Sequence, residues 1–166
     1  KKCEINDWDR LILDESLIQE KIPLILNWIN KQALCQNHYL WGGTLGPDFD
    51  CSGLIQTAFL KEGIFLPRDS YQMKHFCKHI INFPGEIRLL KMGDILFFGS
   101  NNICNHVGIY FKNGFYFHSS GKEYGRDGIA LDNFLNVTDN ISKHYLSKLQ
   151  SAGRVIRSYQ WDRTIR

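Results

Sequence analysis

Apolar residues in the first quarter of the chain recur at helical spacing. The positions that would share one face are Ile22, Ile25, Leu26, Ile29 and Ala33. Because they stand three or four residues apart, they predict an amphipathic helix around residues 23–34. Residues 1–20 are polar with isolated apolar positions, so we expect an arm or linker remnant there and a single domain over residues 21–166.

A second helix is predicted over residues 51–62. Its apolar face would contain Leu54, Ile55, Ala58 and Phe59. Asp50 is a residue type that caps helix N-termini, and Gly63 stands where a glycine commonly ends a helix. A shorter third helix is predicted over residues 70–79.

The pattern changes beyond residue 94 to short apolar and aromatic runs separated by Gly or Asn. Such runs predict strands, here at residues 95–98, 107–111, 115–119 and 154–159. One further helix is predicted around residues 142–149. Helices followed by antiparallel strands indicate an α+β domain rather than alternating β-α-β units.

Composition supports a single folded domain and points to no macromolecular partner. Of the 166 residues, 43% are hydrophobic and 22% charged, which excludes a mostly disordered chain. The net charge of +3 comes from scattered Lys and Arg, so nucleic acid is a weak candidate. No apolar run is long enough for a membrane span, and the N-terminus lacks a signal-peptide pattern. The chain begins with Lys1 rather than Met, which indicates a processed or trimmed product.

The five cysteines form an odd set without a CxxC pair, so at least one is free and no structural zinc site is indicated. Cys51 differs because it would lie in the first turn of the predicted second helix. Unpaired N–H groups and the helix dipole favour an anion there, which would lower the thiol pKa and favour the reactive thiolate. The alternative for Cys51, and the expected role of the other four, is a buried small apolar residue.

A cysteine nucleophile needs a base within hydrogen-bond reach and a group that orients the base. His106 begins one predicted strand and His118 lies near the end of the next, in a hairpin that turns at residues 113–114. A two-residue loop would put the two imidazoles on opposite faces. A three-residue loop, residues 112–114, would pair His118 with Gly108 and put both imidazoles on one face. We predict the three-residue loop.

Other polar residues are weaker candidates. His75, Cys77 and His79 resemble a metal cluster, but on a helix Cys77 would point away from the two histidines. An exposed polar helix is therefore favoured over a zinc site, and no metal is assigned. Asp94 is expected in a turn at a strand start, and His144 on the surface of a polar helix.

Six short motifs occur in an order that resembles a known family. They are Tyr39-Leu-Trp-Gly-Gly43, Asp50-Cys-Ser-Gly53, Leu66-Pro-Arg-Asp-Ser70, Gly93-Asp-Ile-Leu-Phe-Phe98, His106-Val-Gly-Ile-Tyr110 and His118-Ser-Ser120. Each alone is a weak signal. Together they cover nearly the whole chain, which resembles the NlpC-type cell-wall cysteine endopeptidases.

The resemblance implies a papain-like α+β core in which N-terminal helices pack on a central antiparallel sheet and the nucleophilic cysteine opens a helix. It implies Cys51 as nucleophile, His106 as base and His118 as the group that orients the base. The implied reaction is hydrolysis of the γ-D-glutamyl–diaminopimelate bond of peptidoglycan stem peptides, without a cofactor. The implied place of action is the bacterial cell envelope or periplasm, or the cytoplasm, and the sequence does not choose between them.

The resemblance also implies a set of substrate-binding residues. They are Tyr39, Trp41, Asp50, Ser52, Asp69 and Ser70. Carboxylates can hold a free amine, and hydroxyls with backbone N–H groups can hold the α-carboxylate of D-glutamate. Relatives that prefer a free N-terminal L-Ala usually carry a preceding small all-β domain, and nothing like it fits in residues 1–20, so we expect that domain to be missing.

Two other functions stay open at this point. The same fold can act as another amidase or acyltransferase. An inactive module that binds cell-wall peptide is the second alternative, against which the presence of Cys51, His106 and His118 argues.

Overall fold

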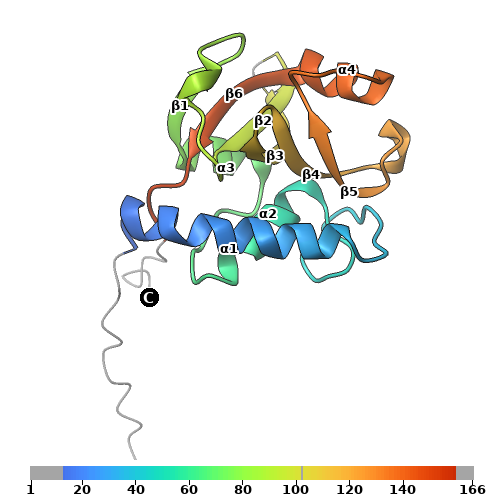
Figure 1. The fold of residues 1–166 in the computed structure, drawn as a ribbon. Coiled ribbons are helices and arrows are strands. Elements are labelled where there is room, and N and C mark those ends of the chain that lie inside the picture. The colour runs from blue at the N-terminus through green and yellow to red at the C-terminus, as the bar shows by residue number, and fades with distance from the viewer. Residues whose placement is uncertain (1–12, 102, 160–166) are drawn as a thin grey trace, which may run out of the picture.

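The computed structural model describes residues 13–101 and 103–159, which form four α-helices and a six-stranded sheet (Figure 1). The helices are α1 (Glu15–Ala33), α2 (Cys51–Leu60), α3 (Ser70–Phe76) and α4 (Asn140–Lys148). The strands are β1 (Lys78–Asn82), β2 (Ile95–Ser100), β3 (Ile103–Lys112), β4 (Phe115–Ser120), β5 (Gly128–Asn133) and β6 (Leu149–Arg154). All neighbouring pairs are antiparallel, in the order β1-β6-β2-β3-β4-β5. The predicted α+β class is confirmed.

Helices cover both faces of the sheet. Figure 1 shows α1 and α2 together on one side and α4 on the other. Side chains alternate along β2, so Ile95 and Phe97 join the core beneath α1 and α2, whereas Leu96 and Phe98 join a second core that includes Tyr145 of α4. Because both faces are covered, the central strands are apolar on both sides, which explains the continuous apolar runs in the sequence.

The first helix is longer than its sequence pattern indicated. It begins at Glu15, with the Asp14 side chain accepting from the Leu17 N–H at 3.0 Å, and buried Ile18 extends the predicted apolar face by one turn. Residues 15–20 are therefore helix rather than arm. Residues 1–12 of the predicted arm lie outside the described residues.

The predicted third helix over residues 70–79 is too long. Helix α3 ends at Phe76, and the next segment becomes β1, in which Lys78 pairs with Arg154 of β6. This pairing turns Cys77 into the core while His79 stays exposed. Within residues 13–101 and 103–159, no three His, Cys, Asp or Glu side chains come together as metal ligands.

Three strands differ from the sequence pattern. The predicted strand at residues 154–159 is wrong, because β6 ends at Arg154, and β1 and β5 were not predicted. Strand β6 lies between β1 and β2 and contains Ser151, Ala152 and Gly153, which have little intrinsic strand preference. Pairing with a neighbour on each side therefore decides its conformation.

The hairpin has the predicted register but not the predicted loop. Ile109 pairs with Phe117, the same register that would set Gly108 opposite His118. Lys112 nevertheless pairs with Phe115, so the loop itself has two residues, 113 and 114. The pairing shifts by one residue between Tyr110 and Lys112, and this shift makes the two-residue loop compatible with the pairing of Ile109 with Phe117.

Asp94 has the predicted turn role and a second role that the sequence did not reveal. Its Oδ2 accepts from the Lys91 N–H at 2.9 Å just before β2. The carboxylate also pairs with Arg154, whose Nε and Nη2 donate at 2.8 and 2.9 Å. Both side chains are buried, so this ion pair joins β2 to the end of β6 inside the protein.

Candidate active site

Cys51 lies at the first position of α2, and Asp50 caps that helix as predicted. The Gly53 N–H donates to Asp50 Oδ1 at 2.6 Å. Gly53 has a steric reason to be glycine, since a Cβ there would lie 2.0 Å from the Gly43 carbonyl oxygen. The Asp-Cys-Ser-Gly motif thus lets the preceding loop pack directly on the first turn of α2.

Asp50 is held by a dense set of hydrogen bonds. The Gly42 N–H donates to its Oδ2 at 2.8 Å, and the Arg68 guanidinium binds both carboxylate oxygens. Arg68 Nη1 also donates to Ser52 Oγ at 2.8 Å. Asp50 is only 6% exposed. Its carboxylate therefore joins the loop, α2 and the segment before α3, and has little capacity left for a ligand.

The expected thiolate at Cys51 is wrong for the resting protein. Burial raises the pKa of Cys51 to about 11, although hydrogen bonds from the backbone of Val107 and Ser52 oppose this shift. Cys51 does lie at a helix start, but removal from water raises its pKa by more than the helix start lowers it. Cys51 is therefore a neutral thiol at pH 7.

His106 and His118 lie on one face of the hairpin, as predicted, with His106 Nε2 2.9 Å from His118 Nδ1. Their rings pack in the aromatic core on the α4 side, against Phe98, Tyr116 and Tyr145. Burial among these rings, followed by the neighbouring His118, lowers the pKa of His106 well below its usual value. His106 is therefore a neutral imidazole at pH 7.

A β-bulge precedes His106. Phe98 pairs with His106 and Gly99 with Cys104, so Asn105 is an extra residue in β3. In a regular strand residues 104 and 106 share a face, but here Cys104 joins the core on the α2 side whereas His106 packs on the α4 side. The bulge thus lets β3 supply both the core and the site.

Asp132 is the site residue that the sequence did not reveal. Its Oδ2 is 2.9 Å from His118 Nε2, and Arg126 binds both of its oxygens. Burial alone would raise the pKa of Asp132, but the hydrogen bonds from His118 and Arg126 hold it below its usual value. The signal in the sequence was a single acidic residue after the apolar run Ile129–Leu131, in a strand that was not predicted.

This carboxylate determines the tautomers of both histidines. An ionised Asp132 only accepts hydrogen bonds, so His118 carries its proton on Nε2. Neutral His118 then accepts at Nδ1, which places the proton of His106 on Nε2. His106 Nδ1 is left with its lone pair, which is the form required of a base.

All the binding residues expected from the sequence line one cavity together with Cys51. This cavity, of about 380 Å³, also contains Arg68, Tyr71, Cys104 and Asn105. Asp69 is exposed in it, Trp41 is 85% exposed, and Ser70 Oγ donates to the Cys104 carbonyl at 3.2 Å. Among the expected residues, Asp50 is the one whose charge is already paired.

A second cavity, of about 440 Å³, is lined by His106 and not by Cys51. Tyr39, Trp41 and Asn105 line both cavities, so the two form the halves of one cleft past Cys51 and His106. The second half also contains His144, which stacks on Tyr124 with ring centroids 4.9 Å apart. His144 was expected on the open surface of its helix and instead is half-buried in this wall.

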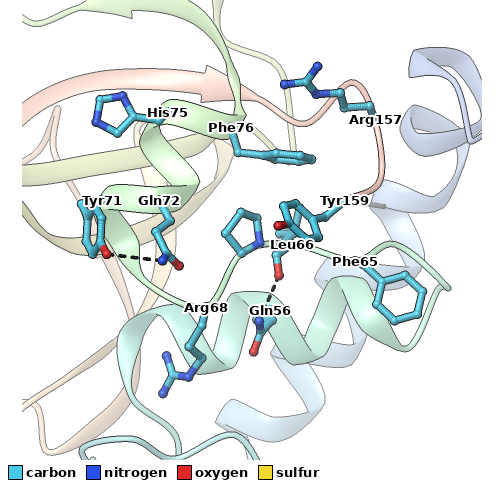
Figure 2. A pocket seen from close by; sticks show the side chains of 11 residues that line it. Gln56, Phe65, Leu66, Arg68, Tyr71, Gln72, His75, Phe76, Arg157 and Tyr159 are labelled. Atoms are coloured by element: carbon cyan, nitrogen blue, oxygen red, sulfur yellow. Dashed lines mark hydrogen bonds between the residues drawn. The ribbon is translucent and has the colours of Figure 1, made fainter. Parts of the chain in front are cut away.

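A third cavity, of about 660 Å³, adjoins the Cys51 half, since Arg68 and Tyr71 line both. Figure 2 shows it between Arg68 and Gln56 on one side and Phe76 and Arg157 on the other. Its lining includes His75 but not Cys51, His106 or His118, so it extends the cleft away from the cysteine and the paired histidines.

The NlpC/P60 family model matches residues 36–152, which include every residue of the two cleft halves. The chain belongs to the NlpC/P60 family. A relative in Bacillus subtilis, named bifunctional muramidase/DL-endopeptidase CwlT, is 34% identical over 122 residues, which cover 70% of this chain and 32% of that protein. A second B. subtilis relative, named gamma-D-glutamyl-L-lysine dipeptidyl-peptidase, is 36% identical over 84 residues, covering 49% of this chain and 27% of the relative. This NlpC/P60 chain thus spans about a third or less of the length of these two relatives.

Solved structures of NlpC/P60 proteins share the fold. One from Staphylococcus aureus, described as similar to a lipoprotein of the NLP/P60 family, aligns with a TM-score of 0.62 and 26% identity, over 84% of this chain and 42% of that one. The peptidoglycan hydrolase RipB of Mycobacterium tuberculosis aligns with a TM-score of 0.62 and 22% identity, over 87% of this chain and 68% of that one. Among the residues described for this NlpC/P60 chain, no helix combines the length and the apolar character that crossing a membrane requires.

Proposed function

We propose that this chain is a cysteine peptidase that hydrolyses the γ-D-glutamyl–diaminopimelate bond of peptidoglycan stem peptides. One observation carries most of the proposal: His106 is hydrogen-bonded through His118 to the buried carboxylate of Asp132, and the backbone of Val107, the residue that follows His106, hydrogen-bonds to Cys51. A thiol, an imidazole and groups that orient the imidazole are the parts needed for nucleophilic acyl transfer. The relatives named as a DL-endopeptidase and as a gamma-D-glutamyl-L-lysine dipeptidyl-peptidase support the substrate class.

The reaction begins from a neutral thiol and a neutral imidazole. His106 Nδ1 takes the Cys51 proton as the sulfur attacks the γ-carbonyl carbon and forms a tetrahedral oxyanion. Collapse of this intermediate breaks the C–N bond, and the proton on His106 passes to the leaving amine. Water that gives a proton to His106 then attacks the thioester, which releases the glutamyl carboxylic acid and restores the Cys51 thiol.

Two groups are assigned to the oxyanion. The first is the backbone N–H of Cys51, in the helix turn where such donors lack helical partners. The second is the Tyr39 hydroxyl, which lines both halves of the cleft. Burial, and then the charges of Cys51 and Asp50, raise the pKa of Tyr39, so its hydroxyl keeps the proton that it donates.

The dipeptide before the scissile bond is assigned to the Cys51 half. Because the Asp50 carboxylate is already bonded to Arg68 and to backbone N–H groups, we assign a free N-terminal amine to exposed Asp69 instead. Arg68, together with Ser52, offers donors for the α-carboxylate of D-glutamate. In this scheme Asp50 acts by holding Arg68 in place.

The test is mass spectrometry of products from L-Ala-γ-D-Glu-diaminopimelate and from intact peptidoglycan. Cys51→Ala should lower turnover by more than about a thousandfold, because no other group supplies the nucleophile. Cys35→Ala is the matched control, since Cys35 is exposed at the end of α1 and should leave turnover unchanged.

Three outcomes would contradict the proposal. Cleavage of a different amide would indicate another amidase, and transfer of the acyl group to an added amine would indicate an acyltransferase. Binding of the peptides without any Cys51-dependent product would indicate an inactive binding module.

A further inference from the structure

The His106 half of the cleft contains two opposite charges that do not pair with each other. Glu123 lies in the short 3-10 helix Lys122–Tyr124, and Lys148 ends α4. Within residues 13–101 and 103–159, the Glu123 carboxylate has no hydrogen bond or ion pair, and Lys148 Nζ bonds to the neutral Ser100 Oγ at 2.8 Å. Both charges are therefore available to a ligand of opposite charge.

Glu123 is held at this position by close contact with the backbone. A Cβ on Gly121 would lie 2.4 Å from Glu123 Oε2, so the carboxylate packs directly over that glycine. Its charge also contributes to raising the pKa of Tyr39, after burial and the charges of Cys51 and Asp50. The carboxylate thus faces the cleft near the point where its two halves meet.

Lys148 and the stacked rings of His144 and Tyr124 also line the His106 half. Ser100 at the end of β2 orients the Lys148 ammonium, and His144 with Tyr124 forms a wall of the same half. A ligand in this half would meet a carboxylate, an ammonium and aromatic faces around a volume of about 440 Å³.

The proposed reaction identifies the part of the substrate that would bind in the His106 half. His106 gives its proton to the leaving amine, and it is His106, not Cys51, that lines this half. The leaving residue is a diamino acid. The far end of diaminopimelate carries an ammonium and a carboxylate on one carbon, whereas the far end of lysine carries an ammonium alone.

We propose that Glu123 binds the ammonium and Lys148 the carboxylate at the far end of the leaving diamino acid, so that this half of the cleft selects diaminopimelate over lysine. The inference rests on the proposed function, because it assumes that a diamino acid is the leaving residue. It adds a substrate-binding residue, Glu123, and a specificity residue, Lys148, and none of the six sequence motifs contains either.

The experiment compares two peptides, L-Ala-γ-D-Glu-diaminopimelate-D-alaninamide and its L-lysine counterpart. The terminal amide removes every free carboxylate beyond D-glutamate except the one at the far end of diaminopimelate. Wild type should prefer the diaminopimelate peptide in kcat/KM. Lys148→Met should lower the ratio of the two kcat/KM values about tenfold, the expected effect of losing one charge-assisted hydrogen bond.

Glu123→Gln should lower kcat/KM for both peptides about tenfold, because both carry the ammonium. Gly121→Ala should do the same to a smaller extent, since the added methyl group displaces the Glu123 carboxylate. Lys143→Met is the matched control, because Lys143 is an exposed lysine of α4 that does not line the cleft, and it should leave the ratio unchanged.

Two results separate failure of this inference from failure of the proposed function. If wild type cleaves the γ-D-glutamyl bond but Lys148→Met leaves the ratio unaltered, the assignment of Lys148 is overturned while the proposed function stands. If wild type cleaves neither peptide at that bond, the proposed function itself is overturned.

Discussion

The two halves of the candidate cleft differ in how their charges are partnered. In the Cys51 half, Asp50 and Arg68 bind each other and the surrounding backbone. In the His106 half, Glu123 and Lys148 line the same space without pairing among the described residues. The comparison teaches that a carboxylate whose oxygens are already bonded to the framework acts by holding its partner in place, whereas an unpaired charge can bind a ligand directly.

The two halves also differ in the structure that supports them. The Cys51 half rests on the first turn of α2, whereas the His106 half rests on a buried chain of hydrogen bonds from His118 through Asp132 to Arg126. Arg126 continues to Asp139, the N-cap of α4, at 2.9 Å. The imidazole of His106, the proposed base, is thus connected to the helix that carries Lys148.

The largest expected effect comes from breaking that chain. Asp132→Asn removes the charge that fixes the His118 tautomer, and with it the lone pair on His106 Nδ1. We expect kcat to fall by about a hundredfold to ten-thousandfold with KM little changed, as for other hydrolases that lose the carboxylate behind a histidine. Steady-state kinetics on the diaminopimelate peptide measures both values.

The matched control for this variant is Asp139→Asn. Asp139 also binds Arg126, but it does not contact His118, and asparagine preserves the helix cap. Its kcat should stay within a few-fold of wild type. Equal losses in the two variants would mean that Arg126, rather than the His118 tautomer, controls activity.

The next largest effect is expected from removing the ion pair between Asp50 and Arg68 in the Cys51 half. Asp50→Ala should lower the free energy of unfolding by about 3 kcal/mol, because it leaves Arg68 without its counter-charge and removes the cap of α2. Arg68 is partly exposed, which keeps this loss below that of a fully buried pair. Urea unfolding followed by circular dichroism measures the change.

Asp48→Ala is the control in the same loop, since Asp48 accepts from the His38 N–H but pairs with no arginine in the described part of the chain. It should cost about 1 kcal/mol. A cost for Asp50→Ala no larger than this would show that the charges of the Cys51 half do not support the fold.

The smallest expected effect is that of pH, because kcat should change little near neutrality. Protonation of His106 removes the base, and because burial lowers its pKa below 6.5, kcat should be half-lost only below pH 6.5. Burial raises the pKa of Cys51 to about 11, so no second inflection is expected up to pH 9. The measurement is kcat at saturating peptide, where titration of the free substrate amine does not enter. A bell-shaped profile centred near neutrality would indicate a thiolate–imidazolium pair instead.

The Cys51 half was the easier one to predict from sequence. Tyr39, Trp41, Asp50, Ser52, Asp69 and Ser70 all lie in short motifs, and α2 with its cap follows from local residue preferences. What the sequence could not show was that Arg68 occupies the Asp50 carboxylate, or that burial of Cys51 outweighs the helix dipole. Both depend on how segments pack in three dimensions.

The His106 half was only partly predictable. The register of the hairpin placed His106 and His118 on one face, because side chains in a strand alternate. Asp132 comes from β5, which is positioned by pairing with β4, and Lys148 ends α4, whose Tyr145 packs in the second core. No local spacing connects them, so their convergence appears only in the fold.

The two side chains that are proposed to react belong to different packing layers. Cys51 belongs to the core under α1 and α2, whereas the rings of His106 and His118 pack in the aromatic core on the α4 side. Proteins open locally before they unfold as a whole, and separate packing layers are natural units of such opening. Detachment of the helix layer from the sheet would therefore separate the proposed nucleophile from the proposed base while most of the chain is still folded, and loss of the proposed activity would report that the two layers have separated.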